Sequence, residues 1–224
     1  METLVGKYKR LLQATSTAYV RSLMDEINWK TRLLAIRGAR GVGKTTLMLQ
    51  YLKMHYEGDG REALYVSLDN VYFTRHSLGE FVEQFYMRGG KHLFLDEVHK
   101  YPEWSREIKN IYDEYPDMRI VFSGSSVMRL KEENPELNEI TKVYYLRGLS
   151  FREFLNLKSG HSFRAYTLDE LLANHQEIAQ TILKEVNPMS FFQDYLHHGF
   201  YPFYLEKRNF SENLLKTMNM MIEV

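Results

Sequence analysis

The sequence contains no cysteine among its 224 residues. This absence excludes a disulfide framework, a metal site built from thiolates and a cysteine nucleophile. The sequence also lacks any run near the roughly 18 apolar residues that cross a bilayer, and no apolar stretch of the signal-peptide type follows its first residues. We therefore predict a cytoplasmic protein that has no membrane partner.

An excess of either charge is also missing. Lysine plus arginine and aspartate plus glutamate number 29 each, so the formal net charge is zero and the pI is near 7.1. Because no global charge attracts a polyanion, any contact with DNA or RNA would need a local basic patch. The chain is still long enough to bury a complete hydrophobic core without disulfides or metals.

Short apolar runs alternate with helical patterns between about residues 31 and 147. This alternation predicts an α/β fold in which helices cover both faces of a parallel sheet. The predicted strands lie at 33–36, 63–68, 93–95, 119–122 and 143–146. Ahead of the first strand, apolar spacing from Leu4 to Ile27 predicts an amphipathic helix.

The strand signal vanishes after Ser150, and only helical patterns follow. We expect a boundary in the stretch 157–166, which separates an α/β core at residues 1–157 from a small helical subdomain at residues 158–224. The final helical pattern, residues 214–224, has neither a C-cap nor a polar tail. We therefore expect the chain to be a truncated piece of a longer protein.

A phosphate-binding motif occupies residues 38–45, whose letters GARGVGKT match G-x-x-x-x-G-K-[ST] in full. The alternative is a chance match in a glycine-rich turn, but the motif follows a predicted buried strand and precedes a predicted helix, as it must. Glycines let backbone N–H groups point at phosphates, and the helix N-terminus adds positive partial charge. We predict that Lys44 reaches the β and γ phosphates and that the Thr45 hydroxyl ligates Mg²⁺. The predicted nucleotide contacts are Gly38, Ala39, Arg40, Gly41, Val42, Gly43, Lys44, Thr45 and Thr46.

Two carboxylates, Asp96 and Glu97, directly follow the third predicted strand. We predict that Asp96 holds Mg²⁺ and that Glu97 orients and polarises the attacking water. An acidic surface turn is the alternative, although a turn of that kind rarely follows three buried apolar residues at once. The pair is typical of P-loop ATPases. No Asn-Lys-x-Asp base-reading motif occurs, so ATP is favoured over GTP.

The fourth predicted strand ends in serines. In the expected sheet this strand lies between the strand before the loop and the acidic strand, so its carboxyl end would face the γ phosphate. We predict that Ser123 and Ser125 hydrogen-bond the phosphate or the attacking water. For each serine the alternative is the N-cap of a following helix.

These motifs, together with LRGLSFREFL at 146–155 and YLHHGFYP at 195–202, resemble a family of ATPases. The family comprises the prokaryotic AAA+ P-loop ATPases that carry an additional C-terminal domain of poorly known function, and it is related to archaeal and STAND ATPases. The resemblance spans about residues 7–224. It implies an AAA+ core with the sheet order 5-1-4-3-2, followed by a helical lid that closes over the nucleotide.

The resemblance also implies roles for single residues. Asp96 and Glu97 would act in ATP hydrolysis, and Gly199 with Pro202 would place the lid backbone near the adenine. The family usually has a second glycine in that turn, where this chain has Phe200. The family's additional domain is missing here, in line with a truncated chain. A homo-oligomer would fit the resemblance.

The leading hypothesis is an ATPase that couples hydrolysis to movement of the lid against the core, with a client protein or nucleic acid that the sequence does not name. The first alternative is a DExH helicase fragment, because residues 96–99 spell that motif, although the chain shows no second motor domain. Another is a STAND-like switch with little turnover, in which a partner reads the position of the lid. A small-molecule kinase ranks last, since no acceptor pocket is identifiable.

Overall fold

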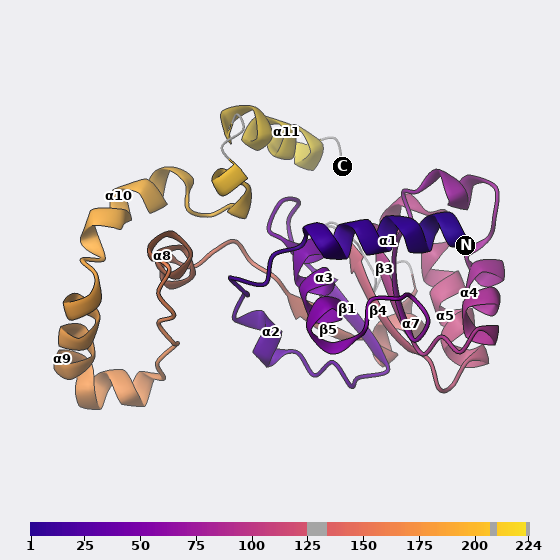
Figure 1. Ribbon diagram of the computed structural model, residues 1–224, viewed down its shortest axis with the longest axis horizontal. Coiled ribbons are helices and arrows are strands. Elements are labelled where there is room, and N and C mark those ends of the chain that lie inside the picture. Colours follow the sequence, from indigo (N-terminus) through magenta and orange to yellow (C-terminus); the bar gives the residue numbers. More distant parts are fainter. Residues whose placement is uncertain (125–133, 207–209, 223–224) are drawn as a thin grey trace. The chain divides into compact units, whose positions relative to one another are not determined.

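The computed structural model describes residues 1–124, 134–206 and 210–222, and the chain divides into two compact units, Met1–Leu146 and Arg147–Val224. In the first unit, five parallel strands form a sheet in the order β2-β3-β4-β1-β5 (Figure 1). The strands are β1 (Leu33–Arg37), β2 (Ala63–Ser67), β3 (His92–Asp96), β4 (Arg119–Gly124) and β5 (Lys142–Tyr145). This is the predicted order 5-1-4-3-2 counted from the other edge, so the predicted fold class is confirmed.

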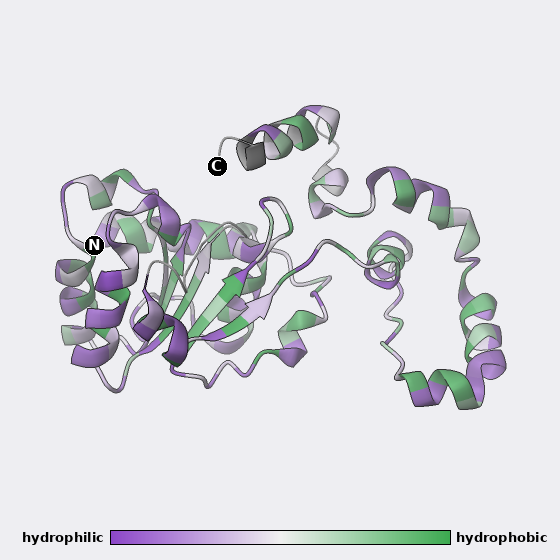
Figure 2. Ribbon diagram, turned by 180° about the vertical axis from the view of Figure 1, so that it is seen from behind, coloured by the Kyte–Doolittle hydropathy of each residue, from purple (hydrophilic) through white to green (hydrophobic). Residues whose placement is uncertain are grey.

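The central strands form the hydrophobic core of the first unit. All five residues of β3 are buried, and so are the first four of β1 and of β2. Figure 2 shows hydrophobic residues concentrated along these strands. Parallel strands that are buried on both faces need nearly continuous apolar runs, and each fully buried Leu, Ile or Phe contributes about 1.5–3 kcal/mol. The apolar runs in the sequence therefore mark the strands well.

Helices flank the sheet in the first unit. They are α1 (Glu2–Ala14), α2 (Leu23–Glu26), α3 (Lys44–His55), α4 (Leu78–Met87), α5 (Trp104–Glu114) and α7 (Pro135–Ile140), with the 3₁₀ helices η1 (Val71–Thr74) and η2 (Val98–Lys100). α1 packs against α3 and β2, and α4 packs against α5. A capping box between Ser77 and Glu80 starts α4, and Gly89, at φ 90°, follows its end.

The N-terminal segment differs from the single helical pattern predicted between Leu4 and Ile27. α1 ends at Ala14 and α2 begins only at Leu23, with a non-helical stretch between them. Side chains of α3 hold that stretch, because Lys53 donates to the carbonyl of residue 15 at 2.6 Å and Gln50 donates to the carbonyls of residues 16 and 19 at 2.8 and 2.7 Å. These tertiary hydrogen bonds take carbonyls that a continuous helix would use, and they override the local apolar spacing.

The second unit is helical. It contains α8 (Phe151–Ser159), α9 (Leu168–Glu185), α10 (Met189–His198), η3 (Pro202–Glu206) and α11 (Phe210–Ile222). The predicted boundary at residue 157 placed α8 with the core, whereas the structure places it in the second unit. The reason is packing: the Phe154 ring lies 5.5 Å from that of Tyr195, and the ammonium of Lys158 lies 3.1 Å from Asp194. α8 therefore belongs with α10.

No helix in the described part of the chain is both long and apolar enough to cross a bilayer.

Candidate functional site

The predicted phosphate loop connects β1 to α3. It turns through two glycines with positive φ, Gly41 at 81° and Gly43 at 99°, and α3 begins at Lys44. A third glycine is required for space, because a Cβ on Gly38 would overlap the backbone carbonyl oxygen of Leu146. The first amides of a helix have no partner inside the helix, so the N-terminus of α3 offers N–H groups at this loop.

Lys44 lies inside this loop. Only 7% of the residue is exposed, and its Nζ donates to the carbonyl oxygens of Gly38 and Ala39 at 2.9 and 3.0 Å. Burial lowers the pKa of the ammonium, while the carboxylates of Glu97 and Asp96 oppose this effect. The Lys44 side chain thus lies where the backbone of the loop curves around it.

Asp96 ends β3 as the most connected side chain of the site. It is 1% exposed. Its Oδ2 accepts hydrogen bonds from Thr45 Oγ1 at 2.5 Å and from the Tyr65 hydroxyl at 2.7 Å, and its Oδ1 accepts from Ser123 Oγ and from the backbone N–H of Glu97. A buried carboxylate needs such donors to stay ionised. Burial and the neighbouring Asp96 raise the pKa of Tyr65, so its hydroxyl remains a donor.

The oxygens of Thr45 and Asp96 suit a magnesium ion. Both are hard ligands of the kind that Mg²⁺ prefers, and they are neighbours, because the Thr45 hydroxyl donates to Asp96 Oδ2 at 2.5 Å. Among the described residues no group of three His, Asp or Glu side chains could hold a metal. A metal here would therefore take its other ligands from water and from phosphates, as Mg²⁺ commonly does.

Glu97 follows Asp96 in an unusual backbone conformation. Its φ and ψ are 52° and 38°, in the left-handed region that few residues other than glycine adopt. Such conformations cost of order 1–3 kcal/mol and cluster at functional sites. The Glu97 side chain is partly exposed, and its Oε2 lies 3.4 Å from Nε2 of His99.

A family model described as an AAA domain matches residues 30–155, which is more than half of the chain. The chain belongs to the AAA domain family. The match includes the phosphate loop, the acidic end of β3 and the tip of β4, and thus the whole cluster around Asp96.

Curated relatives of this AAA domain protein come from Methanocaldococcus jannaschii. The uncharacterized protein MJ1637 is 28% identical over 193 residues, which cover 80% of this chain and 40% of that protein. The uncharacterized protein MJ1544 is 24% identical over 143 residues, covering 62% of this chain and 32% of that protein. This chain therefore spans well under half the length of these relatives. Among solved structures, a complex of Saccharomyces cerevisiae Hsp104 with casein is 16% identical with a TM-score of 0.48, covering 86% of this chain and 40% of that chain.

The remaining predicted residues lie in different places. Ser123 is fully buried at the end of β4, and its hydroxyl donates to Asp96. Ser125 lies outside the described residues. Pro202 begins η3 in the second unit of the AAA domain protein, and its contact with a nucleotide stays a prediction. Arg40, Gly41 and Thr46 are exposed around the loop, and Val42 is buried in it.

Two side chains at the site were not singled out by sequence. Tyr65 donates to Asp96 from β2, and Arg21 donates from its Nη1 to the carbonyl of Val42 in the loop at 3.0 Å. The signal for Tyr65 was its place on a strand whose end pairs with the acidic strand, since Ser67 is opposite Asp96. Arg21 gave no such signal, because it reaches the loop from the non-helical stretch before α2.

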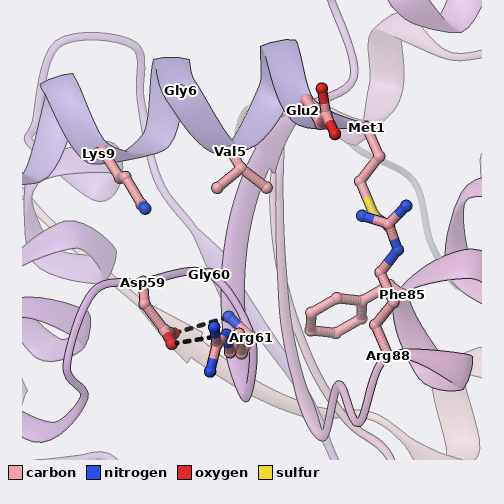
Figure 3. A pocket seen from close by; sticks show the side chains of 10 residues that line it. All are labelled: Met1, Glu2, Val5, Gly6, Lys9, Asp59, Gly60, Arg61, Phe85 and Arg88. Carbon is pink, nitrogen blue, oxygen red and sulfur yellow. Dashed lines mark hydrogen bonds and ion pairs between the residues drawn. The ribbon is translucent and has the colours of Figure 1, made fainter.

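A hollow of about 460 Å³ lies elsewhere in the first unit (Figure 3). Its lining residues are Met1, Glu2, Val5, Gly6, Lys9, Asp59, Gly60, Arg61, Phe85 and Arg88. Residues 59–61 come just before β2 begins, whereas Asp96 is at the carboxyl end of β3. Arg61 is paired with Asp59 at 3.4 Å, and none of the residues around Asp96 lines the hollow. The site of this AAA domain is thus defined by its polar contacts and not by this cavity.

Proposed function

We propose that this chain binds Mg²⁺–ATP at the cluster of Lys44, Thr45 and Asp96 and hydrolyses the ATP with Glu97 as the base. One observation carries the proposal: the phosphate loop and the end of β3 meet directly, through the 2.5 Å hydrogen bond from Thr45 to Asp96. Membership of the AAA domain family supports it. The lack of a guanine-reading motif favours ATP over GTP.

Each side chain has a role that its surroundings explain. The Lys44 ammonium, now bonded to two loop carbonyls, would turn to the β and γ phosphates, which are stronger acceptors. Thr45 and Asp96 would hold Mg²⁺, whose charge would neutralise the phosphates. Ser123 would keep the Asp96 carboxylate in place, and the sensor role toward the γ phosphate that we predict for it, and for Ser125, would require it to change partner.

Glu97 would orient the attacking water and accept its proton as the water oxygen bonds to the γ phosphorus and the bond from that phosphorus to the leaving oxygen of ADP breaks. Its left-handed backbone projects the side chain from the end of the strand, and its partial exposure leaves it accessible to water. General-base catalysis of this kind is typically worth about 10²–10⁴-fold in rate.

The wider biology is part of the same proposal. Hydrolysis would move the helical second unit as a lid, with Pro202 near the adenine, and this movement would act on a client protein or nucleic acid in the cytoplasm. A homo-oligomer is the assembly we propose. The chain covers 40% and 32% of the lengths of the two curated relatives. The activity of the whole protein is therefore also a proposal.

Binding and hydrolysis of Mg²⁺–ATP test the proposal in the parent chain, Lys44→Ala and Glu97→Gln. We expect Lys44→Ala to weaken binding at least about tenfold, through loss of charge-assisted hydrogen bonds. We expect Glu97→Gln to bind normally and to turn over about 100-fold more slowly. Glu103→Gln is the matched control, because Glu103 also has a left-handed backbone, at φ 56°, but lies at the start of α5.

Other outcomes point to other functions. Tight retention of nucleotide, with turnover in the parent no faster than in Glu97→Gln, would favour the STAND-like switch. Turnover that rises strongly on addition of DNA or RNA would favour the helicase alternative. A parent chain that binds no nucleotide would refute the proposal altogether.

A further inference from the structure

His99 contacts Glu97, the base of the proposed reaction, and the proposed function gives it no role. Its Nε2 lies 3.4 Å from Oε2 of Glu97, and the two side chains are 26% and 29% exposed. Both residues lie on the same short turn after β3, so the contact is fixed by local chain geometry and needs no second element.

The backbone of this turn brings the two side chains together. Glu97 is left-handed and caps η2, with its carbonyl accepting from the Lys100 N–H at 2.9 Å. Val98 between them is fully buried and anchors the turn in the core. The buried Val98 thus fixes the left-handed backbone at Glu97, and the side chains of its two neighbours, Glu97 and His99, contact each other.

The other nitrogen of the ring supports the same geometry. Nδ1 of His99 is buried and has no hydrogen-bond partner within the described residues. The contact with Glu97 is thus the ring's one ion pair or hydrogen bond in that part of the chain. Burial lowers the pKa of His99 and Glu97 opposes this. The ring therefore meets Glu97 through Nε2, while Nδ1 is the ring nitrogen without a partner in that part of the chain.

We propose that His99 is a positioning residue that fixes the direction of the Glu97 carboxylate. The inference rests on the proposed function. A glutamate has several rotatable bonds, and a base that is displaced by about 1 Å can cost about 100-fold in rate. Nε2 of His99 restrains the oxygen that would take the proton from the attacking water, while Lys44, Thr45 and Asp96 hold the phosphates and Mg²⁺ independently of it.

Three substitutions test the contact through steady-state ATP hydrolysis. We expect His99→Ala to lower kcat about tenfold, with KM for ATP within about threefold of the parent value, because binding does not involve the ring. His99→Gln places an amide N–H near the position of Nε2, and we expect it to restore kcat to within about threefold. His99→Asn reaches only to the position of Nδ1, so we expect it to be as slow as His99→Ala. If His99→Ala folds poorly, the difference in kcat between His99→Gln and His99→Asn tests the contact instead.

A double-mutant cycle with Glu97→Gln separates positioning from a general structural effect. If His99 acts through Glu97, His99→Ala causes no further loss in the Glu97→Gln background. An equal loss in both backgrounds, or a kcat of His99→Ala equal to the parent, overturns the inference while the ATPase proposal stands. A parent without turnover refutes the ATPase proposal and this inference with it.

Discussion

Replacing Tyr65 by phenylalanine removes one oxygen from the centre of the site and leaves the packing of β2 intact. The hydroxyl of Tyr65 donates to Asp96 at 2.7 Å, and both residues are buried, at 5% and 1% exposure. Phenylalanine has nearly the same shape, so the substitution opens no cavity and tests the hydrogen bond alone.

The expected loss in the free energy of unfolding follows from the chemistry of the acceptor, a carboxylate. A hydrogen bond to a charged group contributes about 1.5–3 kcal/mol, and a buried carboxylate that loses a donor keeps the cost of its desolvation. Thr45, Ser123 and the Glu97 N–H remain as donors to Asp96, so the carboxyl group keeps three of its four partners. We therefore expect the free energy of unfolding to fall by about 2 kcal/mol, or roughly 4–8 °C in Tm for a chain of this size.

Tyr8 provides the matched control. It is fully buried on α1, and its hydroxyl has no hydrogen-bond partner within the described residues. Removing an unpaired buried hydroxyl removes a desolvation cost, so Tyr8→Phe is expected to be neutral or to stabilise by up to about 1 kcal/mol. Urea unfolding of the parent and both variants, without nucleotide or Mg²⁺, gives the two differences side by side.

A double-mutant cycle makes the test strict. In an Asp96→Asn background the acceptor is neutral, so Tyr65→Phe should cost about 1 kcal/mol less than it does in the parent. Two results would refute the claim that Tyr65 supports this carboxylate. One is an equal loss in the free energy of unfolding for Tyr65→Phe and Tyr8→Phe. The other is a double variant at Tyr65 and Asp96 whose loss equals the sum of the two single losses.

Two further predictions concern the fold around the site. Burial lowers the pKa of His92 from 6.5 to about 3, so its neutral ring contributes stability above pH 6.5 that is lost as the pH falls toward 3, about 3 kcal/mol by pH 4. The Tyr56 hydroxyl lies 2.7 Å from Nδ1 of His92, and His92→Asn keeps a hydrogen-bonding group there. In urea unfolding at pH 7 and pH 4, His92→Asn should therefore lose less stability between the two pH values than the parent. An equal loss in the parent and the variant would contradict this. Gly38→Ala should destabilise by about 1–3 kcal/mol and weaken ATP binding, because its methyl group meets the Leu146 carbonyl. Gly6→Ala on α1, with open space around it, should instead stabilise by about 0.5–1 kcal/mol, and thermal unfolding distinguishes the two.

Patterns that depend on burial could be predicted from the sequence. Strands buried on both faces leave continuous apolar runs, so β1, β2, β3 and β4 were predicted to within two residues of their observed ends. The ends of α4 also coincide with signals that are local in the sequence, a capping box at its start and a glycine after its end. The strand order came from the resemblance, since no property of one strand names its neighbour.

Contacts between distant side chains could not be predicted in the same way. The break after α1 depends on Gln50 and Lys53, which lie more than 30 residues away. The role of Tyr65 depends on the register of β2 with β3, which places its hydroxyl beside Asp96 although the two are 31 positions apart. A tyrosine in an apolar run looks like any packed aromatic residue until that register is known.

The chain itself already provides hydrogen-bond partners for Lys44 and Asp96. Lys44 holds two carbonyls of its own loop, and Asp96 is surrounded by four donors. A ligand that engages them must first displace these internal partners, so its affinity is the difference between two sets of hydrogen bonds. Removing an internal partner can therefore lower the stability of the fold and raise the affinity for the ligand at the same time. A variant selected for thermal stability at this site would bind the ligand more weakly.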